Sequence, residues 1–225
     1  MRRSVFITGG TGYIGRGLIP ELLARGHEVR ALVRAGAEGR LPSGASAILG
    51  DALQHASYAA QVRPADTFVH LVGVSHPSPA KAALFQSVDV ASVREAITAA
   101  TGAGVRHLVY VSVAQPAPVM REYQEARAES EALIRQSGLN ATILRPWYVL
   151  GPGHRWPIVL LPLYWVFGRL PASRETAHRL GLVTLGQMIQ ALAAAIEAPP
   201  PPPSQGVRII SVPEIRATRT ANYAN

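Results

Sequence analysis

The sequence predicts an α/β fold in which a doubly wound parallel sheet is covered by helices on both faces. Short β-branched runs alternate with longer helical patterns along most of the chain, which is the order of elements in such folds. The short runs lack alternating polar residues, as is typical of strands buried on both faces. The 225 residues, 48% of them apolar and 16% charged, suffice for one sizeable core and exclude disorder of the whole chain.

The first strand is expected at residues 5–8, and the helix after it runs from Ile14 to Ala24 with apolar residues at helical spacing. Further strands are expected at residues 29–33, 47–49, 67–72, 107–113, 141–144 and 207–212. Further helices are expected at about 80–100, at 119–136 and at 185–197.

A single domain is expected over residues 1–216, with its core at 1–150 and a small C-terminal substrate or lid segment at 151–216. The composition changes after Gly151-Pro152-Gly153, where the lid segment begins. Residues 199–203 are five prolines and predict a stiff connector, and residues 217–225 are expected to fray.

Residues 156–170 of the lid segment are strongly apolar. A transmembrane span is not expected, because crossing a bilayer takes about 20 residues and because Pro157 and Pro162 interrupt this shorter run. Three interpretations stay open: an ordinary buried helix, a helix that covers a substrate cleft, and a segment in peripheral contact with a membrane.

The chain is basic, with 22 Lys and Arg against 14 Asp and Glu, and Lys81 is its only lysine. The arginines are scattered from Arg2 to Arg219, so nucleic-acid binding is not expected and a small anionic ligand is favoured. The absence of cysteine excludes a disulfide framework and a cysteine nucleophile. No spacing of ligands predicts a metal. Without a signal-peptide pattern, a cytoplasmic protein is expected, as a monomer or small homo-oligomer.

A glycine-rich turn lies between the first strand and the first helix, at Thr8-Gly9-Gly10-Thr11-Gly12-Tyr13-Ile14-Gly15. In such a turn Gly9 permits the tight bend, Gly12 lets the backbone approach a diphosphate, and Gly15 lets helix and strand pack closely. The start of the helix then offers N–H groups and a partial positive charge to the anion. The motif therefore predicts a dinucleotide site.

This Gly-x-x-Gly-x-x-Gly spacing resembles the short-chain dehydrogenase/reductase superfamily, particularly its extended and atypical members, and the resemblance covers most of the chain. The run from Val105 to Ser112 is similar to a strand of the NmrA-like and complex-I-accessory-subunit-like groups. Leu144-Arg145-Pro146, followed by Val149-Leu150-Gly151-Pro152, resembles the segment of those groups that carries the nicotinamide-side loop. Val88-Asp89-Val90 is similar to a helix position that carries Asn or Asp in relatives.

The resemblance implies a Rossmann-type fold, a small-molecule substrate and a nicotinamide dinucleotide cofactor. After the second strand an acid would bind an adenosine 2′-hydroxyl, but here Arg34 can pair with a 2′-phosphate. NADP(H) is therefore favoured, with NAD(H) as the alternative. The residues that the resemblance and the glycine turn assign to the cofactor are Thr8, Gly9, Gly12, Tyr13, Ile14, Gly15, Arg34, Asp51, Leu71, Val72, Gly73 and Pro146.

Three residues are candidates for catalysis. Reductases of this superfamily use a Ser or Thr, a Tyr, and a Lys four residues after the Tyr, one helical turn away. Here Ser112 and Tyr123 stand in the expected places, and Arg127 stands where Lys belongs. Arginine keeps the charge that favours a tyrosinate, but its planar fork is placed differently from an ammonium.

Two functions remain open from the sequence. One is an NADP(H)-dependent oxidoreductase or epimerase-like enzyme that acts on a small or apolar carbonyl or quinone-type substrate, with Tyr123 as acid/base. The other is a non-catalytic dinucleotide-binding protein of a regulatory or accessory kind. Both stay open because Arg127 stands in place of the Lys of the Tyr-x-x-x-Lys motif, and a test of hydride transfer would separate them.

Overall fold

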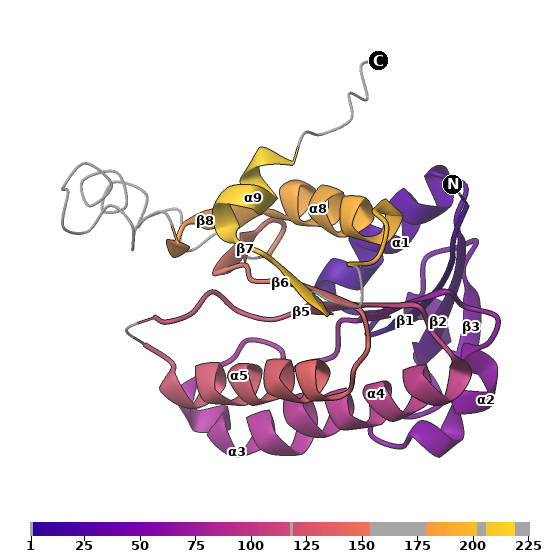
Figure 1. Cartoon of the computed structure of the whole chain (residues 1–225), viewed down its shortest axis with the longest axis horizontal. Coiled ribbons are helices and arrows are strands. Elements are labelled where there is room, and N and C mark those ends of the chain that lie inside the picture. The colour runs from indigo at the N-terminus through magenta and orange to yellow at the C-terminus, as the bar shows by residue number, and fades with distance from the viewer. Residues whose placement is uncertain (1, 118, 154–178, 202–205, 219–225) are drawn as a thin grey trace.

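The computed structural model describes residues 2–117, 119–153, 179–201 and 206–218 (Figure 1). The apolar run at 156–170, with its three interpretations, lies outside these residues. So do residues 219–225 of the tail that is expected to fray and residues 202–203 of the proline run. No helix within the described ranges is long and apolar enough to cross a membrane.

A parallel seven-stranded sheet forms the centre of the molecule, in the order β3-β2-β1-β4-β5-β6-β9. The fold class predicted from the sequence is thus confirmed. The order reverses between β1 and β4, and ligands of such sheets bind outside the carboxyl ends of the strands at this point. The strands are β1 Ser4–Thr8, β2 Glu28–Val33, β3 Ser46–Leu49, β4 Thr67–His70, β5 His107–Val111, β6 Ala141–Leu144 and β9 Val207–Ile210.

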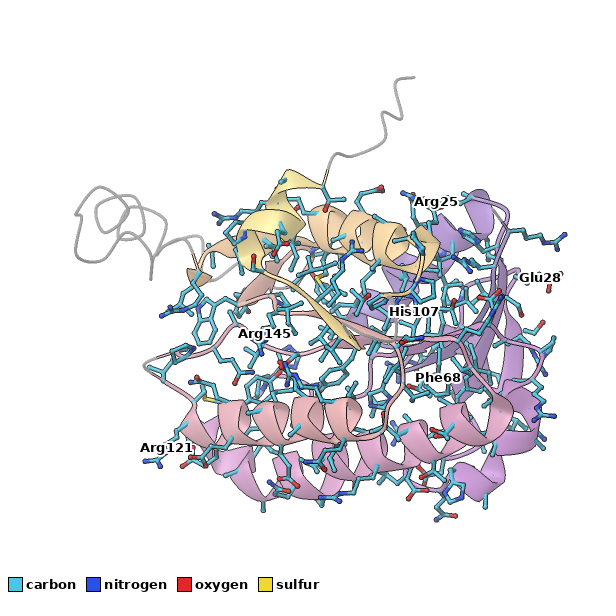
Figure 2. The ribbon with its side chains drawn as sticks, viewed as in Figure 1. Arg25, Glu28, Phe68, His107, Arg121 and Arg145 are labelled. Atoms are coloured by element: carbon cyan, nitrogen blue, oxygen red, sulfur yellow. The ribbon has the colours of Figure 1, made fainter. Side chains whose placement is uncertain are left out.

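Helices cover both faces of the sheet (Figure 1). One face carries α1 Tyr13–Ala24, α8 Leu185–Glu197 and α9 Val212–Ala217, and the other carries α2 Ala59–Val62, α3 Ala82–Leu84, α4 Ala91–Ala103 and α5 Arg121–Gln136. Side chains alternate along a strand, so Val5 and Ile7 enter the core under the first face and Phe6 the core under the second. Phe68 packs in that second core, between the sheet and α4 (Figure 2).

The helix expected at about 80–100 is built from four pieces. A 3-10 turn, η3 Pro79–Lys81, leads into α3, and a π-helical segment, η4 Phe85–Val90, precedes α4. π-helical turns are rare and occur frequently at functional sites. Here the segment carries Asp89, a fully buried carboxylate.

Several short elements were not predicted, among them α2. Strands β7 Tyr148–Leu150 and β8 Leu182–Thr184 form a separate parallel pair. The strand expected at 207–212 ends at Ile210, because the Ser211 and Glu214 side chains form a capping box that starts α9. Short 3-10 turns, η1 Glu38–Arg40 and η2 His55–Ser57, complete the connections around β3.

Candidate functional site

The turn between β1 and α1 is packed so closely that two of its glycines are required by the protein itself. Gly9 has a positive φ of 80°, and a Cβ atom there would lie 2.7 Å from the carbonyl carbon of Leu71. A Cβ atom at Gly15 would lie 2.5 Å from the Gly9 oxygen and 2.7 Å from the Gly10 Cα. Both contacts are with backbone, which cannot turn aside, so a larger residue displaces the turn.

Gly12 is different, because little of the protein faces it. It is exposed, it begins α1 without a side-chain cap, and its N–H donates to the Gly9 oxygen at 3.0 Å. A Cβ atom there would meet only the Gly9 oxygen, at 3.1 Å, among the described residues. The missing side chain thus leaves space outside the turn, beside the positive end of a helix. These features fit the diphosphate of a dinucleotide.

The other residues assigned to the cofactor follow the carboxyl ends of neighbouring strands. Leu71, Val72 and Gly73 come after β4, where the Leu71 N–H donates to the Thr8 oxygen at 3.0 Å. Arg34 is exposed directly after β2. The carboxyl ends of parallel strands meet at one edge of a sheet, so the glycine turn, the loop after β4 and Arg34 lie along this edge.

Asp51 and Pro146 follow β3 and β6 at the same edge. The half-buried Asp51 accepts a hydrogen bond from the Leu53 N–H at its Oδ1, at 2.9 Å, which holds the turn after β3. Pro146 is buried, and its carbonyl oxygen accepts from the Ala114 N–H at 2.8 Å. Pro146 thus joins the loop after β6 to the loop after β5.

The side chain of Thr8 is directed into the interior. Its Oγ1 lies 2.8 Å from Nδ1 of His70, whose Nε2 lies 3.2 Å from the Ser92 hydroxyl. Burial lowers the pKa of His70 to about 3, with a further contribution from the Arg127 charge, so this imidazole is neutral. His70 was not among the residues predicted for the site, although a histidine in an apolar strand is a signal of a buried polar contact.

Arg127 is a buried arginine with partners on three sides. Its Nη2 lies 2.7 Å from Oδ1 of Asp89, and its Nη1 donates to the Tyr110 hydroxyl at 2.9 Å and to the Val111 oxygen at 3.1 Å. Burial lowers the pKa of the guanidinium, but Tyr110, Tyr123 and Asp89 raise it by more. Arg127 therefore keeps its charge inside the protein.

Tyr123 lies over the guanidinium and is half-buried. The Cζ of Arg127 is 5.1 Å from the centroid of the Tyr123 ring, within the range of a cation–π interaction. The ring also packs against Phe85, with centroids 5.2 Å apart. The charge thus faces the ring of the candidate acid/base, as the spacing of four residues predicts.

Ser112 is almost fully buried and donates its hydroxyl proton to Oε1 of Glu131, at 2.7 Å. The same Glu131 accepts from Gln115 Nε2 at 3.0 Å and from Arg145 Nε at 2.9 Å, and it pairs with Arg135 at 3.1 Å. Burial raises the pKa of Glu131, but the hydrogen bonds from Arg145 and Ser112 outweigh it, so the pKa lies below its ordinary value. Glu131 is ionised and joins the ends of β5 and β6.

Glu131 was not among the residues predicted for the site. A signal was present, because residues 123, 127 and 131 recur every fourth position and lie on one face of a helix.

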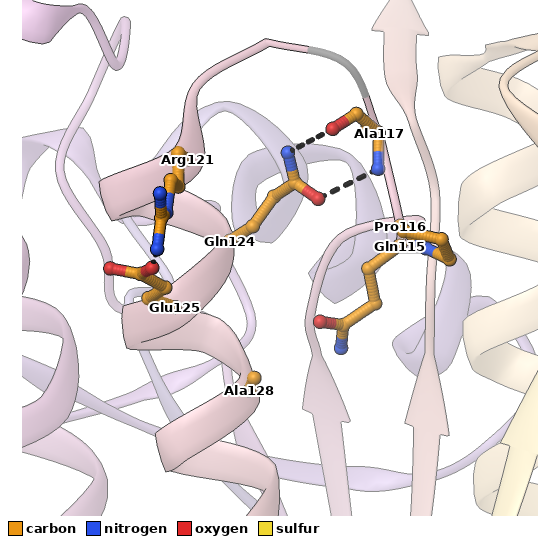
Figure 3. A pocket seen from close by; sticks show the side chains of 7 residues that line it. All are labelled: Gln115, Pro116, Ala117, Arg121, Gln124, Glu125 and Ala128. Carbon is orange, nitrogen blue, oxygen red and sulfur yellow. Dashed lines mark hydrogen bonds and ion pairs between the residues drawn. The ribbon is translucent and has the colours of Figure 1, made fainter.

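A hollow of about 480 Å³ opens between the loop after β5 and the first half of α5 (Figure 3). The Gln124 amide spans it, donating to the Ala117 oxygen at 2.9 Å and accepting from the Ala117 N–H at 2.8 Å. Arg121 and Glu125 also line the hollow and pair with each other at 2.7 Å. The loop between Ser112 and Tyr123 is therefore tied to the helix that carries the tyrosine.

Comparison with known proteins agrees with these features. A family model described as NAD(P)H-binding matches residues 9–155. A 4-hydroxy-2-methyl-3-oxo-4-farnesyl-3,4-dihydroquinoline-1-oxide ketoreductase from Stigmatella aurantiaca is 29% identical over 168 residues, which are 65% of this chain and 50% of that protein. A ceramide reductase from Caulobacter vibrioides is 27% identical over 205 residues, 88% of this chain and 62% of that protein. The chain thus spans about half to three fifths of the length of these relatives.

Solved structures show the same fold. The Bordetella bronchiseptica enzyme WbmG, in complex with NAD and UDP, superposes with a TM-score of 0.68 at 20% identity, over 94% of this chain and 73% of that one. The family model includes most of the glycine turn and both strand ends that carry Ser112 and Pro146. The chain belongs to the NAD(P)H-binding family whose model it matches, and its reductase relatives fit the atypical short-chain dehydrogenase/reductase proteins that the sequence resembles.

Proposed function

We propose that this protein is an NADP(H)-dependent oxidoreductase that reduces the carbonyl group of an apolar substrate. The observation that carries the proposal is the position of Arg127, which contacts the Tyr123 ring on one side and the residue before Ser112 on the other. The guanidinium thus lies between Tyr123 and the backbone next to Ser112. A carbonyl reductase of this superfamily needs these two side chains close together.

A nicotinamide dinucleotide, when bound, supplies the hydride. The chain's own residues would hold it by the backbone of Gly9, Gly12 and Gly15 and by the loop after β4. Tyr123 would deliver a proton from its hydroxyl to the carbonyl oxygen. Ser112 would orient that oxygen, which requires its hydroxyl to turn from Glu131 toward the substrate.

The apolar substrate class is inferred from two observations. The relatives named above reduce, by their names, a farnesyl-bearing quinoline oxide and a ceramide, which are large and apolar. The chain itself carries a strongly apolar run at 156–170, which would lie after the nicotinamide-side loop. A long-chain or isoprenoid ketone or a quinone therefore fits better than a charged sugar.

The preference for NADP(H) rests on Arg34. It follows β2 and is exposed, and a guanidinium binds phosphate through two parallel hydrogen bonds. Arg34→Asp is expected to weaken NADPH binding at least tenfold more than NADH binding in fluorescence titrations. Arg30→Asp, within β2 itself, is the control. Equal losses for both cofactors would remove Arg34 from the phosphate site.

The catalytic proposal is tested by the oxidation of NADPH in the presence of isoprenoid ketones, long-chain ketones and quinones. Tyr123→Phe should lower kcat by about 10² or more, because a positioned proton donor contributes that much, with NADPH affinity unchanged. Tyr58→Phe removes the hydroxyl of a fully buried tyrosine in the second core and should leave kcat unaltered. Full turnover by Tyr123→Phe would refute the proposed acid.

A second candidate function follows from the same arginine. Because the Arg127 guanidinium is paired with Asp89 and Tyr110, a protein that binds the dinucleotide without turnover is also consistent with the site. Tight NADPH binding with no oxidation on any member of the panel would support this regulatory or accessory function.

A further inference from the structure

The π-helical segment η4 and helix α5 meet through two matched contacts. Phe85 packs on Tyr123, with ring centroids 5.2 Å apart, and Asp89 pairs with Arg127 at 2.7 Å. Phe85 and Asp89 are four positions apart on η4, and Tyr123 and Arg127 are four positions apart on α5. Residues at this spacing lie on one side of a helix, so both contacts lie where the two elements face each other. The ion pair therefore determines how α5 sits against η4, and with it the place of the Tyr123 ring.

The ion pair also supports the loop after β4. The second oxygen of Asp89 accepts from the Val74 N–H at 3.1 Å. A Cβ atom at Gly73 would lie 3.1 Å from Oδ1 of Asp89 and would overlap Nη2 of Arg127. The pair thus fills the space directly beneath the Gly73 backbone, in the segment assigned to the cofactor.

Both charges are buried, with side-chain exposures of 8% for Arg127 and 0% for Asp89. Removing one partner of a buried ion pair leaves the other without compensation, which is strongly unfavourable. An ammonium could not replace the guanidinium here, because it is a single point charge, whereas the two terminal nitrogens of Arg127 bond Asp89, Tyr110 and Val111 from one planar group.

We propose that Arg127 and Asp89 act as one positioning unit, which holds Tyr123 and the loop at Gly73 in place, and that Arg127 is not a ligand of the cofactor's ribose. The part that concerns Tyr123 rests on the proposed reductase function. The arginine of the Tyr-x-x-x-Arg motif then has its partner in Asp89, and the motif is not a weakened version of Tyr-x-x-x-Lys.

The test compares the wild-type chain with Arg127→Lys, Asp89→Asn and the double variant. Arg94→Lys is the control, because Arg94 forms an exposed pair with Glu129 at 2.7 Å between α4 and α5. Three quantities are measured for each protein: the melting temperature, the dissociation constant of NADPH by fluorescence titration, and kcat with the KM for NADPH.

Each single variant at the buried pair is expected to melt about 6 °C or more below the wild type. The double variant should lose clearly less than the sum of both, because residues in contact are not additive. The dissociation constant of NADPH should rise by less than tenfold, because the loop at Gly73 loses its support while the glycine turn keeps its contacts. The kcat should fall at least tenfold, because the position of Tyr123 changes. Arg94→Lys should change none of the three quantities.

Several results would overturn the inference. A tenfold or larger change of the NADPH dissociation constant in Arg127→Lys, without a loss of melting temperature, would make Arg127 a cofactor ligand. Additive losses of melting temperature would show that the two residues are not one unit. A loss of melting temperature with unchanged kcat would reduce the pair to a structural role.

If Arg127→Lys does not fold, Asp89→Asn still decides the question. The Asn side chain has the shape of the Asp side chain, and its amide oxygen can accept from the Val74 N–H. The substitution therefore removes only the charge. If the wild type shows no turnover, the reductase function fails, but the melting temperatures and the NADPH affinities still test whether Arg127 belongs to Asp89 or to the cofactor.

Discussion

A methyl group at Gly12 should weaken dinucleotide binding while leaving the fold intact. The backbone at Gly12 has φ −78° and ψ 179°, which alanine adopts without strain. The added Cβ would meet only the Gly9 oxygen, at 3.1 Å, among the described residues, so a shift of a few tenths of an ångström relieves the contact. The space that the methyl group takes is the space we assign to the diphosphate.

The effect of Gly12→Ala on stability is the difference between two small terms. Replacing glycine in a compatible conformation stabilises by about 0.4–1 kcal/mol through the unfolded chain, whereas alanine is less favourable than glycine at a helix N-cap by about 0.5–1 kcal/mol. The free energy of unfolding should therefore change by less than about 1 kcal/mol, or about 2–4 °C in melting temperature for a chain of this size.

The assay is a titration of NADPH and NADH, followed by protein fluorescence, beside a thermal unfolding curve. Gly12→Ala is expected to lose at least tenfold in affinity for both cofactors, since both share the diphosphate. Gly15→Ala is the contrasting variant, because its Cβ would lie 2.5 Å from the Gly9 oxygen. It should lower the melting temperature as well. A folded Gly12→Ala protein with wild-type affinity for both cofactors would place the diphosphate somewhere else.

Two further predictions concern the buried polar groups. Glu131→Gln removes the charge that Arg145 and Ser112 face (Figure 2 shows Arg145), and should lower the free energy of unfolding by about 1–3 kcal/mol. A melting temperature equal to the wild type would show that Arg145 and Ser112 find other partners. Burial holds the pKa of His107 at about 4 and that of His70 at about 3, below the ordinary 6.5. The unfolded chain therefore binds protons below pH 6.5 that the folded chain does not, and stability should fall with pH from 6.5 toward 4, by up to about 1.4 kcal/mol per unit for each histidine. His107→Gln should flatten this dependence between pH 7 and 5, and an unchanged slope would contradict the assignment.

Much of the fold could be predicted because its signals are local. The seven strands of the central sheet were all expected, since each is a short run rich in apolar residues. The inner strands are largely buried, as parallel strands covered on both faces are. The glycine turn was located for the same reason, because its spacing and its place between strand and helix lie within eight residues. The pair β7 and β8 was missed because it joins residues more than thirty positions apart, and three-residue strands carry no pattern of their own.

The candidate site was predicted only in part. The positions of Ser112, Tyr123 and Arg127 came from a resemblance, and their roles stay predictions. Their partners did not follow from the motif. Asp89 reaches Arg127 through a π-helical turn inside what the sequence predicts as one regular helix, and an added residue in a helical turn changes which side chains face the core.

What this sequence determined by itself is the order of strands and helices and the bare backbone at the start of α1, because both depend on residues that are neighbours in the chain. What only the tertiary structure decided is the environment of each ionisable group. Arg127 could have been a solvated or cofactor-facing cation on sequence grounds, and it is a buried partner of Asp89, Tyr110 and Val111. The physical reason is that the electrostatic energy of a charge depends mainly on the groups within a few ångströms of it. For Arg127 those groups belong to β5 and η4, which contact α5 only when the chain is folded.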